Sequence, residues 1–252
     1  MAVRLDELCQ YLDGYLRHDE IADYGGAMNG LQVEGPEVVT RVAAAVDACQ
    51  TTIEQAADAG AELILVHHGL FWGAPFPLTG ARFRRISTLI EKGIAVYSSH
   101  LPLDVHPEVG NNPLLVRELG IEVTGEFAEY KGVPVALSGT WEGTRDDLVR
   151  DVARIVGAEP RLLPFGPERI ERVGVLTGAG GSVVAEAAAA GVDTFVTGEG
   201  SHPCFFDAEE NGLNLILAGH YATETIGVRA LAAHLATKYD LEMAFLSHPT
   251  GL

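Results

Sequence analysis

The stretch Arg41–Gly69 reads RVAAAVDACQTTIEQAADAGAELILVHHG, and a related stretch, RVGVLTGAGGSVVAEAAAAGVDTFVTGEG, follows at Arg172–Gly200. The two align without gaps at an offset of 131 residues, and eight of the 29 positions are identical. Each contains an apolar strand, a turn, an alanine-rich helix that stops at Ala-Gly, and a second apolar strand. Strand–helix–strand units with nearly continuous apolar strands are typical of a buried parallel sheet.

The same order of elements continues beyond both copies. After the first copy come a helical stretch, 82–92, the strand IAVYSS and then the segment His100–Asp104. After the second come a helical stretch, 204–211, the strand LNLILAG and then His220–Glu224. Both third strands therefore end in a histidine that is followed four residues later by a carboxylate. Coincidence of common residues is the alternative, but a match in the order of several elements favours an internal duplication.

We therefore predict an α/β protein made of two similar three-layer halves, 1–128 and 129–252. The boundary falls within 124–132, and the final helix, 226–238, can pack back onto the first half. Other expected elements are an N-terminal helix at 3–17, helices at 111–119 and at 144–155 with Thr144 as cap, and strands at 133–141 and 161–163.

Composition limits the class of protein. The chain has 252 residues, of which 47% are hydrophobic and 21% charged, as in ordinary globular proteins. Met1 leads into an amphipathic stretch and not into a signal peptide, and no apolar run is long enough for a membrane span, so a soluble cytoplasmic protein is expected. The three cysteines are not spaced as a metal motif or a disulfide framework. The net charge of −18 disfavours nucleic acid as a partner.

Ligands collect beyond the carboxyl ends of strands in open parallel sheets. His67 and His68 follow the apolar strand ELILV, and Gly69 allows the chain to turn there. Adjacent histidines within a strand point to opposite faces, but at a strand end both imidazoles can reach the same space. A single histidine in this place is usually structural, whereas two in succession favour metal ligation.

Three further candidate ligands follow the third strand of each half. Asp104 lies in the loop SSHLPLDVHP, where an aspartate is otherwise a common turn residue. His220 and Glu224 begin the last helix, and a spacing of four places both on one face of that helix. A glutamate in a first turn is also favoured by the helix dipole, which is the structural alternative.

Three histidines and two carboxylates suit Zn, Fe, Mn, Co or Ni better than Ca or Mg. Five ligands exceed the needs of one catalytic zinc ion, so we predict a pair of divalent metal ions per chain. Such a pair can activate a water molecule. His100 and His202 are the candidate catalytic residues for proton transfer, although either could be a structural histidine.

The residues resemble the YbgI-like dinuclear metal family, whose members are often named GTP cyclohydrolase I type 2 homologues. The resemblance covers almost the whole chain. It rests on the segments NGLQV (Asn29–Val33), AGAELILVHHGLFW (Ala59–Trp72), SSHLPLD (Ser98–Asp104), TGEGSH (Thr197–His202) and AGHYATETIGV (Ala218–Val228). The His-His and GHYATE segments are specific, whereas NGLQV alone is a weak signal.

The resemblance implies two α/β halves with a metal cleft between them, assembled into toroidal hexamers. It places the metal ligands on His67, His68, Asp104, His220 and Glu224, with Glu224 bridging the ions. Two features depart from the family: SHP at 201–203 replaces a longer segment, and HHGLFW replaces the commoner His-His-Pro. These departures leave the ligand set intact but affect the expected substrate contacts.

Two classes of function follow. The first is a metal-dependent hydrolase of the GTP cyclohydrolase type, in which metal-activated water opens the purine ring of GTP or acts on another nucleotide. The sequence has no P-loop, and its densest basic patch is Arg82, Arg84 and Arg85, which could equally be a solvated helix face. The second is a non-catalytic protein that binds metal, transfers it or serves as an interaction hub.

Overall fold

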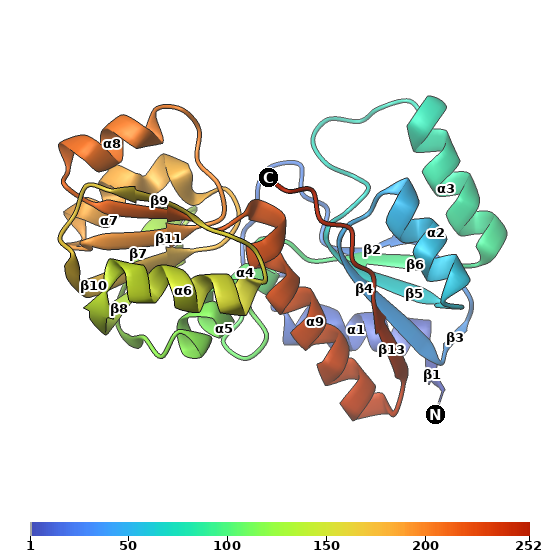
Figure 1. The fold of residues 1–252 in the computed structure, drawn as a ribbon. Coiled ribbons are helices and arrows are strands. Elements are labelled where there is room, and N and C mark those ends of the chain that lie inside the picture. Colours follow the sequence, from blue (N-terminus) through green and yellow to red (C-terminus); the bar gives the residue numbers. More distant parts are fainter. Residues whose placement is uncertain (1) are drawn as a thin grey trace. The chain divides into compact units, whose positions relative to one another are not determined.

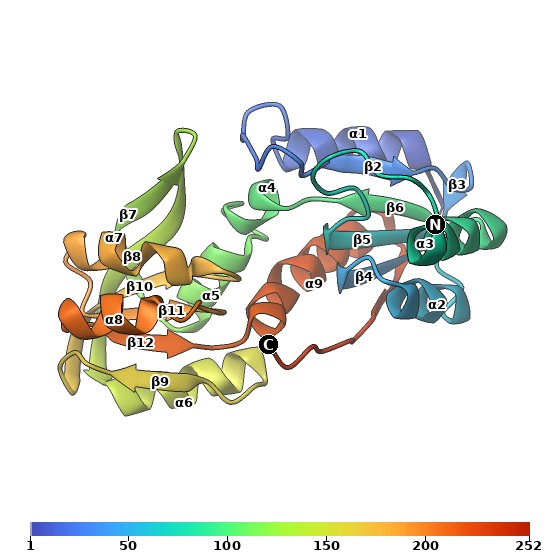
Figure 2. The ribbon, with the colours of Figure 1, turned by 90° about the horizontal axis from the view of Figure 1, so that it is seen from above.

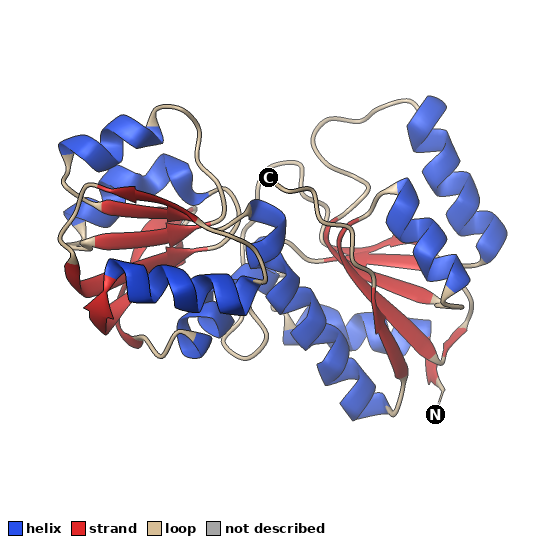
Figure 3. Cartoon of the chain, viewed as in Figure 1, coloured by secondary structure: helices blue, strands red, loops and turns tan. Residues whose placement is uncertain are grey.

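The structure is a computed structural model that describes residues 2–252. It has a mixed α/β fold, as the sequence predicts, with helices and strands distributed along the whole chain (Figures 1 and 3). By its internal contacts the chain divides into two compact units. The first unit contains residues 1–103 and 227–248, and the second contains residues 104–226 and 249–252.

The first unit has a five-stranded sheet in the order β13-β4-β5-β6-β2. Four of the strands are parallel, and β2 pairs antiparallel with β6 at one edge. The bounds are β2 Gly30–Val33, β4 Arg41–Asp47, β5 Leu63–His68, β6 Ala95–Ser98 and β13 Glu242–Phe245. A small two-stranded sheet joins β1 (Val3–Arg4) to β3 (Val38–Val39). The apolar residues of β4 and β5 are buried on both faces, which explains their lack of polar alternation.

Helices cover both faces of this sheet (Figure 2). α2 (Gln50–Asp58) and α3 (Gly80–Lys92) lie on one face, where Ile53 and Leu89 pack against apolar residues of the sheet. α1 (Leu5–Tyr15) and the later part of α9 (His220–Tyr239) lie on the other. Tyr11 of α1 forms a 2.6 Å hydrogen bond with His234 of α9, which ties residues distant in sequence into one unit.

The second unit has a six-stranded sheet in the order β7-β8-β10-β11-β12-β9. Only β10, β11 and β12 are parallel to one another, and the outer strands are antiparallel. The bounds are β7 Glu122–Tyr130, β8 Val133–Thr144, β9 Arg161–Pro164, β10 Arg169–Leu176, β11 Thr194–Thr197 and β12 Asn214–Leu217. The three central strands carry the apolar residues of the second repeat copy and of the segment that follows it.

Two apolar clusters fill the space on either side of this sheet. One includes residues of α5 (Asn111–Glu118) and α6 (Arg145–Val156). The other includes residues of α7 (Val184–Ala189), which follows the short 3-10 helix η1 (Gly180–Val183), and of α8 (Cys204–Glu210). Thr144 caps α6 by accepting a hydrogen bond from the backbone N–H of Asp147, as the sequence predicts.

The compact units divide at a place different from the boundary expected for the repeated halves. The region 124–132 is occupied by β7 and the start of its hairpin with β8, so no linker lies there. The units divide instead after Leu103, because α5 and β8 contact β10, and β7 pairs with β8. Residues 227–248 belong to the first unit, and the halves 1–128 and 129–252 remain a prediction about the duplication.

Two expectations from composition can also be compared with the structure. Cys9, Cys49 and Cys204 are all free thiols. Within residues 2–252, no helix combines the length and the apolar character that a membrane crossing requires.

Candidate metal-binding site

Three histidines of the first unit form a compact cluster at the carboxyl ends of two parallel strands. β5 ends with His67 and His68, and His100 follows β6 closely. One ring nitrogen from each histidine can be chosen so that all three lie within 4.8 Å of one another. β5 continues through His68 and ends before Gly69, and the rings of His67 and His68 lie with centroids 4.7 Å apart. The sequence predicts His100 only as a proton-transfer residue, whereas the structure brings it to the two candidate ligands.

Each of these imidazoles is oriented by an oxygen acceptor at Nδ1. His67 Nδ1 donates to the backbone carbonyl of Ser99 at 3.0 Å. His68 Nδ1 lies 2.9 Å from Asp47 Oδ1, and His100 Nδ1 lies 2.9 Å from Asp23 Oδ1. An imidazole that donates from Nδ1 keeps its lone pair on Nε2, which is the form that ligates metal ions. The cluster therefore has the support that metal-binding histidines require.

Asp23 and Asn29 form a polar network behind His100. Asn29 Nδ2 donates to Asp23 Oδ2 at 2.8 Å, and Asn29 Oδ1 accepts from the backbone N–H of His100 at 2.9 Å. Burial by itself would raise the pKa of Asp23, but hydrogen bonds from His100, Asn29 and the N–H of Tyr24 hold that pKa below its usual value. Asp23 therefore stays a carboxylate and fixes the tautomer of His100.

The second unit carries a histidine–glutamate pair at the first turn of α9. His220 Nε2 lies 3.1 Å from Glu224 Oε1, and His220 Nδ1 lies 3.1 Å from Glu199 Oε1. Burial lowers the pKa of His220, but hydrogen bonds and charge interactions with Glu224 and Glu199 outweigh burial and raise the pKa to about 9. Without a metal ion the imidazole thus holds a proton, which a metal ion would have to displace.

The backbone around this pair leaves room for the carboxylate only because two residues are glycine. A Cβ at Gly178 would collide with Oε1 of Glu224. A Cβ at Gly198 would approach the backbone of His220 to 2.8 Å. Glu224 itself is buried, with 3% of its surface exposed. A buried carboxylate in a tight polar enclosure is suited to a cationic ligand.

Asp104 is also buried in the second unit, at the end of α4 (Leu101–Asp104). Its Oδ1 accepts a hydrogen bond from Asn111 Nδ2 at 2.8 Å. The Thr177 hydroxyl lies 3.5 Å from the same oxygen, and Thr177 also donates to Asn112 Oδ1. Asp104 is thus held by polar groups and is not a solvated turn residue.

His202 has different surroundings from the other candidate residues. It is exposed and packs against Phe206, with ring centroids 5.4 Å apart. Together with Arg161 it lines a pocket of about 420 Å³ in the second unit. Its catalytic role remains a prediction.

Sequence reasoning missed the carboxylates that orient the histidines. Asp47 could have been found, because the register of β4 and β5 places it opposite His68. Glu199 was signalled by the repeat, since it occupies the position of His68 in the second copy. Asp23 carries no such signal, because it lies in an irregular loop that only the fold brings to His100.

Nitrogen donors from histidine and oxygen donors from buried carboxylates suit first-row transition metal ions and zinc. All the candidate side chains lie at or just beyond the carboxyl ends of central parallel strands, where α/β proteins bind ligands. The fold and these side chains define an α/β protein with histidine–carboxylate clusters that can bind a metal ion.

Comparison with known proteins identifies the family. The model of the Duf34/NIF3 (NGG1p interacting factor 3) family matches residues 3–250, and the chain belongs to this family. A "GTP cyclohydrolase 1 type 2 homolog" of Deinococcus radiodurans is 42% identical over 249 residues, which cover 98% of this chain and 94% of that protein. A protein of Escherichia coli with the same name is 39% identical over 248 residues, which cover 96% of this chain and 97% of that one.

Two solved structures show the same fold at comparable identity. The protein in the crystal structure of TTHA1606 from Thermus thermophilus is 41% identical, and the two folds superpose with a TM-score of 0.89. The match covers 99% of this chain and 100% of the TTHA1606 chain. The structure of protein ybgI, described as being of unknown function, is 38% identical, with a TM-score of 0.92 and the same coverage. The YbgI-like resemblance seen in the sequence is therefore confirmed.

Proposed function

We propose that the chain binds two divalent metal ions through His67, His68, Asp104, His220 and Glu224. The observation that carries this proposal is that each unit holds its share of these side chains in oriented, polar surroundings. His67 and His68 are fixed through Nδ1 by Ser99 and Asp47, respectively. Asp104, His220 and Glu224 are fixed by partners within the second unit. In the proposed site both clusters contribute to one metal pair.

The proposed activity is hydrolysis. A bound metal pair would supply Lewis acidity and would lower the pKa of a bound water molecule to near neutrality. The protein's own contribution is to orient the ligands, to keep Glu224 buried and to hold protons at His100 and His202. His100 is suited to this because Asp23 fixes its Nδ1 at 2.9 Å and leaves Nε2 for proton exchange.

The specific reaction that we propose is that of a GTP cyclohydrolase I type 2 enzyme, in which the purine ring is opened with loss of formate. The names of the similar proteins support this class, and each of those names ends in "homolog". The test is formate release from GTP by protein with measured metal content, beside His67→Ala and Glu224→Ala as controls. We expect the natural chain to release formate and both variants to release none.

The outcomes of this assay separate the two classes of function. Protein that holds two metal ions per chain and releases no formate would overturn the GTP reaction. If such protein instead passes its metal to an acceptor, the second function, non-catalytic metal binding or transfer, would be favoured. Activity that survives in both variants would show that the reaction takes place elsewhere.

We also propose that the two units descend from a duplication. Their central parallel strands occur in the same sequence order, β4, β5, β6 and β10, β11, β12, with the candidate ligands after them. The family resemblance further suggests a toroidal hexamer of this 26.8 kDa chain. Light scattering on the purified full chain tests the hexamer, and a monomeric mass would contradict it.

A further inference from the structure

A second feature of the first unit lies next to the histidine cluster. The loop between β5 and α3 encloses a pocket of about 360 Å³ together with Gly26 and Met28. Every lining residue is apolar or glycine, and the side chains include Phe71, Trp72 and Phe76. Pockets for small organic molecules measure about 300–1,000 Å³, so this one suits a single ring system better than a large ligand.

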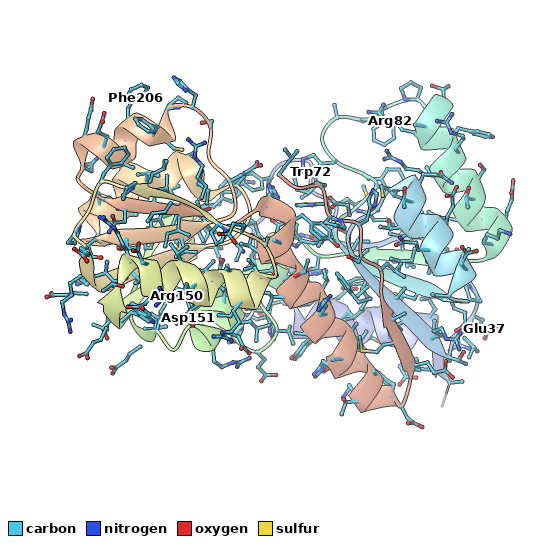
Figure 4. The ribbon with its side chains drawn as sticks, viewed as in Figure 1. Glu37, Trp72, Arg82, Arg150, Asp151 and Phe206 are labelled. Atoms are coloured by element: carbon cyan, nitrogen blue, oxygen red, sulfur yellow. The ribbon has the colours of Figure 1, made fainter. Side chains whose placement is uncertain are left out.

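Trp72 joins the pocket to the candidate metal ligands. Its ring centroid lies 4.8 Å from that of His100 and 6.0 Å from that of His68. Both ring pairs are close to perpendicular, at 85° and 86°. Trp72 lies between β5 and α3 and is 44% exposed, so part of the indole is available to another molecule (Figure 4). Neither His68 nor His100 lines the pocket, so Trp72 is the residue that connects a ring bound there to the imidazoles.

Hydrogen bonds hold the pocket walls in place. Gln32 Oε1 accepts from the backbone N–H of Leu70 at 2.6 Å, while its Nε2 donates to the carbonyl of Met28 at 2.6 Å. Gly73 N–H donates to the carbonyl of Gly26 at 3.0 Å, and a Cβ on Gly26 would collide with the Gly73 backbone. The pocket is thus preformed, and Gln32, which supports its walls without lining it, comes from the NGLQV segment.

The walls present flat aromatic surfaces. Phe71 and Phe76 are stacked, with centroids 5.9 Å apart and planes at 18°. Arg82 lies at the start of α3 (Figure 4). Its guanidinium lies 3.8 Å from the centroid of the Phe76 ring and covers one face of that ring. Parallel aromatic faces favour planar ligands, because ring stacking adds to the burial of apolar area.

We propose that this pocket binds an uncharged planar heteroaromatic ring of the substrate, with Trp72 as the residue that positions it beside His68 and His100. The proposal rests on the proposed function for the identity of the neighbouring site and adds the class of group that is held there. Ring binding itself requires no turnover, so it can be measured separately.

The test uses the two tryptophans of the chain. In the full-length, metal-loaded Trp141→Phe variant, Trp72 is the only source of indole fluorescence. Guanosine, cytidine and ribose 5-phosphate are titrated as probes, and calorimetry on the natural chain provides a second measurement. We expect saturable quenching by a nucleoside and none by ribose 5-phosphate. Comparison of the affinities for guanosine and cytidine shows whether the pocket accepts a two-ring or a one-ring base.

Variants identify the residue responsible. Trp72→Ala should weaken nucleoside binding about 10-fold or more with unchanged metal content, while Trp72→Phe should restore much of the affinity. Phe83→Ala, an aromatic residue of α3 that is 57% exposed and does not line the pocket, is the matched control. Binding that Trp72→Ala leaves unchanged would overturn the proposal.

Two further outcomes would also overturn it. One is the absence of nucleoside binding by protein that holds two metal ions and releases formate from GTP, because this protein would have the proposed function without the ring pocket. The other is a Trp72 fluorescence intensity that changes with protein concentration but not on addition of nucleosides. A second copy of the chain would then cover the pocket. Nucleoside binding without formate release would count against the GTP reaction alone.

Discussion

The Nδ1 atom of His68 lies 2.9 Å from Oδ1 of Asp47, and the two residues are register partners at the carboxyl ends of β5 and β4. The pairing of two parallel strands therefore brings a carboxylate to the back of a candidate metal ligand. Such carboxylates fix the tautomer of a ligating imidazole and raise its basicity. The strand register that forms the sheet thus also places Asp47 beside His68 in the candidate site.

Asp47→Asn should weaken metal binding without removing the ligand. The amide can still accept a hydrogen bond from His68, but it lacks the charge that raises the basicity of the ring. Loss of such a supporting group typically lowers metal affinity about 10–100-fold. Calorimetric titration of metal into metal-free protein measures the change, with the exposed Asp58→Asn as the control. Equal affinity in the Asp47 variant and the natural chain would remove Asp47 from the site.

His100→Gln separates proton transfer from metal ligation. If His100 transfers protons, the variant should keep its metal content and lose about 100-fold or more in turnover. His202→Gln tests the second proposed proton-transfer residue in the same way; His202 is exposed and packs against Phe206. Loss of metal from the His100 variant would instead show that this imidazole completes the ligand cluster with His67 and His68.

Glu62→Gln should change stability in a pH-dependent way. Burial alone would raise the pKa of Glu62, but hydrogen bonds from the backbone N–H groups of Thr40 and Arg41 and from the Thr40 hydroxyl lower it. A lowered folded-state pKa stabilises the protein above the ordinary value of 4.5, and this stabilisation is lost as the pH falls below it. The variant should therefore unfold more easily at pH 7, with a difference that shrinks in acid.

Urea unfolding at pH 7 and at a pH below 4 measures both parts of this prediction. The exposed Glu91→Gln is the control for loss of one carboxylate. An equal difference in unfolding free energy at both pH values would contradict the assigned ionisation of Glu62.

Thr144→Ala should destabilise the second unit by about 0.5–2 kcal/mol. The Thr144 hydroxyl accepts from the N–H of Asp147 and donates to its carboxylate, forming a capping box at the start of α6. Thr144→Ser keeps the hydroxyl and should retain most of the stability. Thermal unfolding of the three proteins decides, and an alanine variant as stable as the natural chain would show that the cap contributes little.

Much of the fold was accessible from sequence because the repeat carries local signals. The apolar strands, the Ala-Gly helix stop and the cap at Thr144 all depend on neighbouring residues, and α6 and β9 lie within a residue of their expected bounds. The division into compact units was not accessible. It depends on the hairpin of β7 with β8, and the β7 segment EVTGEFAEY is mostly exposed and lacks an apolar run.

The candidate site divides in the same way. His67, His68 and His220 follow apolar strands, so position alone marks them. Asp23, Asn29 and Trp72 were missed because they lie in irregular loops, and their role depends on tertiary contacts with His100. A loop residue that orients a histidine 77 positions away leaves no periodic signal in the chain.

Metal stoichiometry tests the central claim most directly. Elemental analysis of the purified full chain, reported as metal per chain, should give about two for the natural protein. His68→Ala and His220→Ala, each from a different unit, should both fall below that value while circular dichroism remains unchanged. A folded natural chain without bound metal, or two ions retained by both variants, would contradict a metal pair held jointly by these residues.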